Sequence, residues 1–236
     1  MLSYIMSRLV ALGLSLAFAS IVIFVMIEMV PGDPASFMLG LNAAPDTVAA
    51  LRAELGLGGS PPERYLRWIG GMLQGDFGTS YTYRTPVAEL VTARLAVSLP
   101  LAVMALLLST LIAIPVGLYA ASRRGGPGDW SVMGLTQLGI AVPNFWFAMI
   151  LVVIFAIQLR WFSAGGFPGW DQGVWPSLKA LTLPAVALAL PQASILARVM
   201  RSSVLEVLGQ DYIRTARAKG LSRRRTLTDH ALRNAL

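Results

Sequence analysis

The chain has 236 residues and a formal net charge of +7, yet only 13% of its residues are charged, against about 25% in soluble domains. Its mean hydropathy of +0.64 indicates an integral membrane protein and excludes an ordinary soluble domain. The chain has no cysteine and a single histidine, His230, so disulfides, thiolate metal sites and a thiol nucleophile are excluded. We expect no metal site and no bound cofactor.

Four stretches without Asp, Glu, Lys or Arg are long enough to cross a bilayer core of about 30 Å as helices, which takes roughly 20 residues. They run over Leu9–Ile27, Leu95–Ser122, Trp130–Leu159 and Ala180–Ala197. The first is longer than the apolar core of a secretory signal and lacks a small-residue cleavage motif, so we expect it to be retained. The sequence therefore predicts an all-α polytopic membrane protein with about four transmembrane helices.

Residues 31–94, between the first two stretches, contain too many apolar residues and too many residues that begin or end helices for a disordered linker. Asp46 is expected to cap a short helix that ends at Gly56. A second helix is expected to begin at Pro61 and to end at Gly75. This segment is predicted to be helical and extracytoplasmic.

The distribution of basic residues predicts the orientation. The segment from Arg198 onward carries nine basic residues against three acidic ones, whereas residues 31–94 carry five basic and six acidic ones. Cytoplasmic segments are enriched in Lys and Arg, and four spans leave both termini on the same side. We therefore expect both the N-terminus and the C-terminus in the cytoplasm.

The glycine-rich stretch Gly125-Gly126-Pro127-Gly128 predicts a tight reversal between the second and third spans. Arg123 and Arg124 before it favour a cytoplasmic position. We expect the two spans to be antiparallel neighbours, with Asp129 capping the third.

Polar residues and prolines lie inside the third and fourth spans. Proline is tolerated in a span only where neighbouring helices or water satisfy the freed carbonyl group. Two interpretations remain open: the amides tie helices together, or they line a hydrated path. The candidate path residues are Gln137, Pro143, Asn144 and Gln192.

One acidic residue, Glu28, lies at the outer end of the first span, one turn before Pro31. An ionisable side chain within a span is a functional candidate. Close to the interface it can instead simply reach water, and both interpretations remain open.

Motifs of catalysis are missing from the sequence. A P-loop needs a glycine-rich turn followed by Lys and Ser or Thr, and neither Lys179 nor Lys219 lies in that setting. No nucleophile elbow and no His-Glu-x-x-His motif is present. We expect no catalytic residue in this chain and no ATP held by a P-loop.

The last segment has two possible helical readings. Residues 205–219 can form one amphipathic helix, whose apolar stripe would consist of Leu205, Leu208, Tyr212 and Ala216. Alternatively, Asp211 begins a fresh short helix, Gly220 forms its left-handed cap, and Ser222 caps the next helix. Either reading predicts a compact, folded helical protrusion with a sharp turn at Gly220.

Three explanations compete for the seven basic residues of segment 211–236. A nucleic-acid site would interleave aromatic residues with the cations, and this segment offers only Tyr212. Attraction to membrane lipid explains the charge but not the small residues Thr215, Ala216, Ala218 and Gly220. The pattern favours a docking element for another protein and excludes nucleic acid.

Several motifs together resemble one family. The stretch DYIRTARAKGLS (Asp211–Ser222), followed by HALRNAL, is similar to the cytoplasmic loop of permease subunits in binding-protein-dependent ABC importers of the dipeptide, oligopeptide and nickel group. Five further stretches resemble sequences of the same family: VPGDPA (Val30–Ala35), GDFGTSY (Gly75–Tyr81), RTPVAELVTARL (Arg84–Leu95), VPNFWFAMIL (Val142–Leu151) and LTLPAVALAL (Leu181–Leu190).

The resemblance implies a type I-like permease fold in the inner (plasma) membrane, forming the pore for peptides or related small solutes. It implies as partners two ATP-binding subunits, a second permease that is usually a paralogue, an extracytoplasmic substrate-binding protein and membrane lipid. It also implies an extracytoplasmic motif at Gly32, Asp33 and Pro34. The implied coupling helix, which contacts the ATPase, comprises Asp211, Tyr212, Arg214, Thr215, Ala216, Arg217, Ala218, Lys219 and Gly220.

The expected organisation is an N-terminus with the first span (1–30), an extracytoplasmic segment (31–94) and a permease core (95–236). Within the core we expect transmembrane helices at about 95–121, 130–159 and 180–200 and a cytoplasmic coupling loop at 202–236. Members of the family continue past HALRNAL with two more spans, so we expect the chain to be a fragment. A secondary transporter, a channel or a membrane scaffold without transport remains the alternative function.

Overall fold

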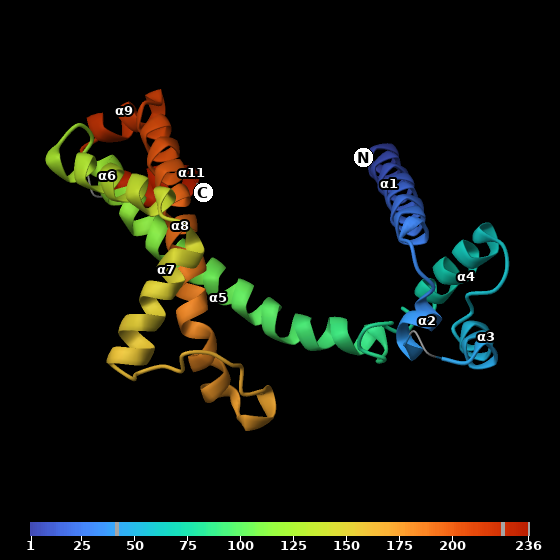
Figure 1. Ribbon diagram of the computed structural model, residues 1–236. Helices are drawn as coiled ribbons and strands as arrows, with labels where there is room; N and C mark the ends of the chain where they lie inside the picture. The colour runs from blue at the N-terminus through green and yellow to red at the C-terminus, as the bar shows by residue number, and fades with distance from the viewer. Residues whose placement is uncertain (41–42, 223–224, 236) are drawn as a thin grey trace. The chain divides into compact units, whose positions relative to one another are not determined.

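The structure is a computed structural model and describes residues 1–40, 43–222 and 225–235. Its regular elements are helices, which divide between two compact units, Met1–Leu95 and Ala96–Leu236 (Figure 1). Within the described residues, three helices are long and apolar enough to cross a membrane, or four if a bent pair counts as one span. The all-α, polytopic architecture predicted from the sequence is confirmed.

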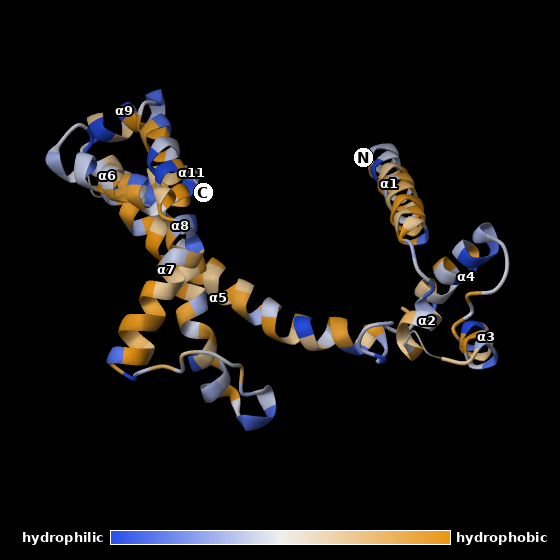
Figure 2. Ribbon diagram, in the orientation of Figure 1, coloured by the Kyte–Doolittle hydropathy of each residue, from blue (hydrophilic) through white to orange (hydrophobic). Residues whose placement is uncertain are grey.

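Before the start of α5, the described residues of the first unit form one long helix and three short ones. They are α1 (Leu2–Met29), α2 (Pro34–Leu39), α3 (Pro45–Glu54) and α4 (Pro61–Leu73). Apolar residues surround α1 along most of its length (Figure 2), and none of its most apolar stretch is buried within the protein. A helix that is apolar all round is suited to a lipid environment.

Prolines begin the short helices, and glycines follow their ends. The residue that precedes α3 is Ala44 and Pro45 occupies its first position, so the prediction that Asp46 caps this helix is wrong. Proline fits the first helical position because its fixed φ and missing N–H cost nothing there, so the helix begins two residues earlier than a cap at Asp46 would imply. Gly56, with φ of 66°, and Gly75, with φ of 86°, follow the ends of α3 and α4 as expected.

Helix α4 packs on the C-terminal turns of α1. Tyr65 forms a hydrogen bond of 2.8 Å between its hydroxyl group and that of Ser20, and its ring lies edge-on to Phe24 with centroids 5.4 Å apart. Arg64 forms an ion pair with Glu28. Glu28, whose role the sequence left open, therefore contributes to the joint between these two helices.

The second unit is built around α8. Its elements are the main part of α5 (Val87–Ser122), then α6 (Pro127–Ala141), α7 (Asn144–Leu151), the π-helix η1 (Val152–Gln158), the 3₁₀ turn η2 (Trp170–Gln172), α8 (Val174–Leu208), α9 (Asp211–Ala218), the π-helix η3 (Thr226–Leu232) and α11 (Arg233–Ala235). The final predicted span, at 180–200, thus forms part of a longer continuous helix that contains Pro184 and Pro191.

The third predicted span is not one helix. Helices α6 and α7–η1 meet at an angle of 97°, across a break at Val142 and Pro143. Both residues are extended, with ψ of 124° at Val142 and 133° at Pro143. Proline disfavours the helical conformation of the residue before it and donates no hydrogen bond itself, so two consecutive residues leave the helix. This bend breaks the continuous span that the sequence predicted at about 130–159.

Small residues let helices approach α8 closely. Ala193, Ser194 and Ala197 of α8 are buried, and a Cβ at Gly117 of α5 would lie 2.7 Å from the carbonyl oxygen of Ala197. Close backbone approach through small residues is the usual way in which membrane helices associate. Among the described residues α6 packs mainly on α8, rather than along α5 as the antiparallel prediction expected.

The turn between α5 and α6 reverses the chain where it was predicted, at Gly125–Gly128. The N-cap of α6 is Gly126, however, so the prediction that Asp129 caps this helix is wrong. Pro127 takes the first helical position, which places Asp129 inside the first turn. There its carboxylate faces Arg201 of α8.

Candidate functional site

The cationic segment after α8 folds as a separate short helix (Figure 1). Helix α8 ends at Leu208, and the chain becomes extended at Gln210, with ψ of 149°, before α9 begins at Asp211. The reading in which Asp211 begins a fresh helix is confirmed. The alternative, one helix over 205–219, is wrong because Gly209 and Gln210 interrupt it.

Ile213 anchors α9 to the rest of the unit. Its side chain is 1% exposed, whereas that of Tyr212 is 46% exposed. The predicted apolar stripe through Tyr212 is therefore wrong, because the helical phase restarts at Asp211. Sequence reasoning missed Ile213, although its spacing of three residues from the half-buried Ala216 carries the signal of an inward face.

The end of α9 is closed by two backbone hydrogen bonds. The N–H of Gly220 donates to the carbonyl of Arg217 at 2.9 Å, and the N–H of Leu221 donates to that of Ala216 at 3.2 Å. With φ of 89° at Gly220, this is the Schellman arrangement. The left-handed cap predicted at Gly220 is confirmed, and it turns the chain sharply out of the helix.

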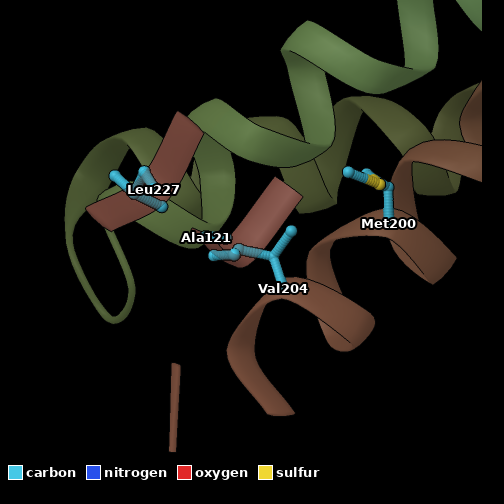
Figure 3. Packing of buried hydrophobic residues seen from close by; sticks show 5 residues of the cluster. Ala121, Met200, Val204 and Leu227 are labelled. Carbon is cyan, nitrogen blue, oxygen red and sulfur yellow. The ribbon is translucent and has the colours of Figure 1, made fainter. Parts of the chain in front are cut away.

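The chain after this cap returns to the core. The hydroxyl group of Ser222 accepts a hydrogen bond of 3.4 Å from the N–H of Arg225, as the predicted N-cap would. Leu227 of η3 then packs with Ala121, Met200 and Val204, which come from α5 and α8 (Figure 3). Helix α9 is therefore held at both ends by packed structure. Of the coupling loop predicted at 202–236, residues 223, 224 and 236 lie outside the described part of the chain.

The outer face of α9 is open and cationic. Arg214, Arg217 and Lys219 are exposed on it. Within the described part of this helix, Asp211 is their acidic partner: its carboxylate lies 3.5 Å from Arg214, and both side chains are largely exposed. Exposed pairs of this kind contribute roughly 0–1 kcal/mol. The face is thus free to exchange its charge interactions with those of a partner.

The structure brings one candidate path residue to a charged partner. Gln137 of α6 accepts a hydrogen bond of 3.1 Å from Arg198 of α8. These helices line a shallow, open hollow of about 480 Å³, to which Arg198 and Arg201 both contribute. Asn144 begins α7 directly after Pro143, and Gln192 is exposed on α8. No interaction within the described residues joins Gln137 to either of these amides.

The predicted extracytoplasmic motif forms a local cap. Asp33 is the N-cap of α2, and its carboxylate accepts hydrogen bonds from the N–H and the hydroxyl group of Ser36, at 3.1 and 2.9 Å. Pro34 occupies the first helical position, and Gly32 has φ of 124°. Arg52 of α3 lies 3.6 Å from the same carboxylate. The motif thus fixes the start of α2 and links it to α3.

Both halves of the chain match models of membrane components of binding-protein-dependent transport systems. The family model described as "Binding-protein-dependent transport system inner membrane component" matches residues 113–236, and a model of the N-terminal part of such membrane components matches residues 1–102. A probable peptide ABC transporter permease of Sinorhizobium fredii is 40% identical over 98% of the chain and 74% of its own length.

Two further relatives extend the comparison. An oligopeptide transport system permease of Bacillus subtilis is 39% identical over 92% of the chain and 70% of its own length. A dipeptide transport system permease of Escherichia coli is 35% identical over 100% of the chain and 77% of its own length.

Proposed function

This chain belongs to the family of binding-protein-dependent transport system inner membrane components, and we propose that the solute it helps to import is a peptide. It is a multi-pass permease subunit, the non-catalytic membrane component of an ABC transport system. A system of this type includes ATP-hydrolysing subunits and a binding protein. Peptide as the solute is supported by the similar permeases, which are named for peptide, oligopeptide and dipeptide transport.

In our proposal, α9 is the coupling helix that docks on an ATP-hydrolysing subunit. The single observation that carries this assignment is the combination of a buried anchor, Ile213, with an exposed cationic face on the same short helix. A rigid helix transmits displacement, whereas a loose one would absorb it. The docking residues are Asp211, Tyr212, Arg214, Thr215, Ala216, Arg217, Ala218, Lys219 and Gly220.

The orientation follows from the same assignment. We place α9 and both termini in the cytoplasm, where ATP is hydrolysed, and residues 31–94 on the outer side, where a binding protein delivers solute. Span 1–30, the extracytoplasmic segment 31–94 and the core 95–236 then form the three functional parts. A second permease, which we expect to be a paralogue, completes the pore.

The break between α6 and α7 supports a translocation path for the solute that passes this point of the core. Extended backbone within a membrane is tolerated where it is buried in protein or lines a water-filled cavity. Val142 and Pro143 are extended within an otherwise helical stretch. We therefore assign Gln137, Pro143, Asn144 and Gln192 to the translocation path.

Uptake by the complete transporter tests the proposed function. The complex, copurified from its native membrane and reconstituted in proteoliposomes, should accumulate a labelled dipeptide only with ATP and the binding protein. Uptake driven by an ion gradient without ATP would support the alternative of a secondary transporter. Binding of partners without flux would support a scaffold.

A further inference from the structure

An ion pair joins the first turn of α6 to the last turns of α8. Arg201 donates from Nε to one oxygen of the Asp129 carboxylate and from Nη2 to the other, both at 2.6 Å. The side chain of Asp129 is only 5% exposed, and its carboxylate also accepts the N–H of Gly125 at 2.9 Å. Two parallel bonds from a planar guanidinium fix orientation as well as distance. The pair therefore resists rotation of one helix end against the other.

Two other contacts make this pair one end of a longer joint between α6 and α8. Gln137 bonds to Arg198, and Gly139 lies directly against Ser194. The residue numbers of successive partners increase along α6 and decrease along α8, so the two helices run antiparallel. At a rise of 1.5 Å per residue, Asp129 is about 15 Å along the helix from Gly139. Without the ion pair, α6 could pivot about the close contact at Gly139.

The residues on either side of Arg201 along α8 belong to the packed group of helices that includes α9. Met200 and Val204, on either side of it along α8, pack with Leu227 of η3. Helix α9 in turn contacts η3. The end of α8, η3 and α9 therefore form one packed group. The ion pair of Asp129 with Arg201 links α6 to this group.

We propose that Asp129 and Arg201 are a positioning pair through which movement of α9 reaches α6 and, beyond it, the bend at Val142 and Pro143. This proposal rests on the docking role of α9 stated above. The pair lies within the unit, with Asp129 buried and the side chain of Arg201 25% exposed. Its role is to keep α6 at a fixed angle to the moving end of α8, so that α6 follows α9 instead of pivoting.

Conservative variants separate this role from simple stability. Removing one partner completely would leave a buried charge without compensation. Arg201→Lys keeps the charge but replaces the two-point contact by one rotatable ammonium group. Asp129→Asn keeps the shape of the acceptor. The matched control is Arg123→Lys, the same exchange at an exposed arginine before the α5–α6 turn.

The first measurement is the amount of dipeptide imported per ATP hydrolysed by the complete transporter in proteoliposomes. We expect Arg201→Lys and Asp129→Asn each to lower this ratio several-fold, with normal amounts of assembled complex and with ATP hydrolysis retained. The double variant should be no worse than the poorer single one, because both substitutions break one unit. Arg123→Lys should match the unmodified protein. An unchanged ratio in both single variants, or parallel losses of uptake and hydrolysis, would overturn the proposal.

A distance measurement provides a readout that does not depend on activity. The chain has no cysteine, so spin labels at Ser131→Cys on α6 and Ser202→Cys on α8 would be unique within it. We expect one narrow distance distribution, with and without bound nucleotide, and a broad distribution once Arg201→Lys is added. A distribution that stays narrow in Arg201→Lys would refute the positioning role. If instead Gly220→Val leaves uptake per ATP unchanged, the docking role of α9 fails independently of this pair.

Discussion

Gly139 of α6 and Ser194 of α8 are in direct contact, with no room for a side chain between them. A Cβ placed on Gly139 would overlap the hydroxyl group of Ser194, which itself bonds to the carbonyl of Leu190 at 3.0 Å. Gly134, on the same helix, has no heavy atom within 4 Å of the corresponding position. The two glycines thus differ in packing while sharing helix and residue type.

This difference predicts opposite effects of one substitution. Gly139→Ala should destabilise the helix joint by about 1–3 kcal/mol through overpacking. Gly134→Ala should be neutral or stabilising, because alanine is favoured over glycine in a helix by roughly 1 kcal/mol. Thermal unfolding of the two purified variants measures the effect. Equal shifts in both would show that α6 and α8 do not approach closely at Gly139.

The buried anchor of α9 predicts a second contrast. Ile213→Ala should remove a fully buried side chain at a cost of about 2–5 kcal/mol, whereas Tyr212→Ala removes a half-exposed one and should change stability far less. We expect faster hydrogen exchange across α9 in Ile213→Ala only. If Tyr212→Ala loosened the helix and Ile213→Ala did not, the inward face of α9 would be wrongly assigned.

Asn144 offers a test of the proposed path. It begins α7 immediately after the extended residues Val142 and Pro143. Asn144→Leu should reduce dipeptide uptake several-fold while the complex assembles normally, because the amide would no longer contact solute or water in the path. Phe145→Leu, at an exposed apolar neighbour, is the control. A loss of assembly in Asn144→Leu, with normal uptake by the remaining complex, would support the alternative in which the amide joins helices.

Signals confined to a few neighbouring residues were readable from the sequence. The positions of Gly75 and Gly220 predicted helix ends because a left-handed residue is required there and glycine adopts it without cost. The same holds for Pro61 at the start of α4, since proline suits a first helical position. Such features are decided locally, and the structure agrees with them.

Features that depend on distant partners were not readable. Asp129 was predicted to cap α6 because acidic residues often do, but its partner Arg201 lies 72 residues away. The size of the bend at Pro143 depends on ψ of Val142, which proline restricts without fixing. The inward face of α9 required knowing that the helix restarts at Asp211, which resets the phase of every residue after it. The pairing of Asp129 with Arg201 depends on distant residues, whereas the bend and the restart of α9 depend on how far a few extended residues interrupt a helix.

Gly220 provides the strongest test of α9 as the coupling helix. Its φ of 89° lies in the left-handed region, which costs a residue with a side chain about 1–2 kcal/mol and is least costly for asparagine. No heavy atom lies within 4 Å of the position of an added Cβ, so the strain comes from the backbone and not from a clash. Gly220→Val should therefore unravel the end of α9, whereas Gly220→Asn should preserve it.

The two variants should separate coupling from expression. In the complete transporter we expect Gly220→Val to hydrolyse ATP but to import several-fold less dipeptide per ATP, and Gly220→Asn to remain close to the unmodified protein. The physical reason is that the Schellman bonds from Gly220 and Leu221 hold the last turn of α9, where Arg217 and Lys219 would face the ATPase. Equal coupling in the two variants would show that the rigid end of α9 does not transmit the movement.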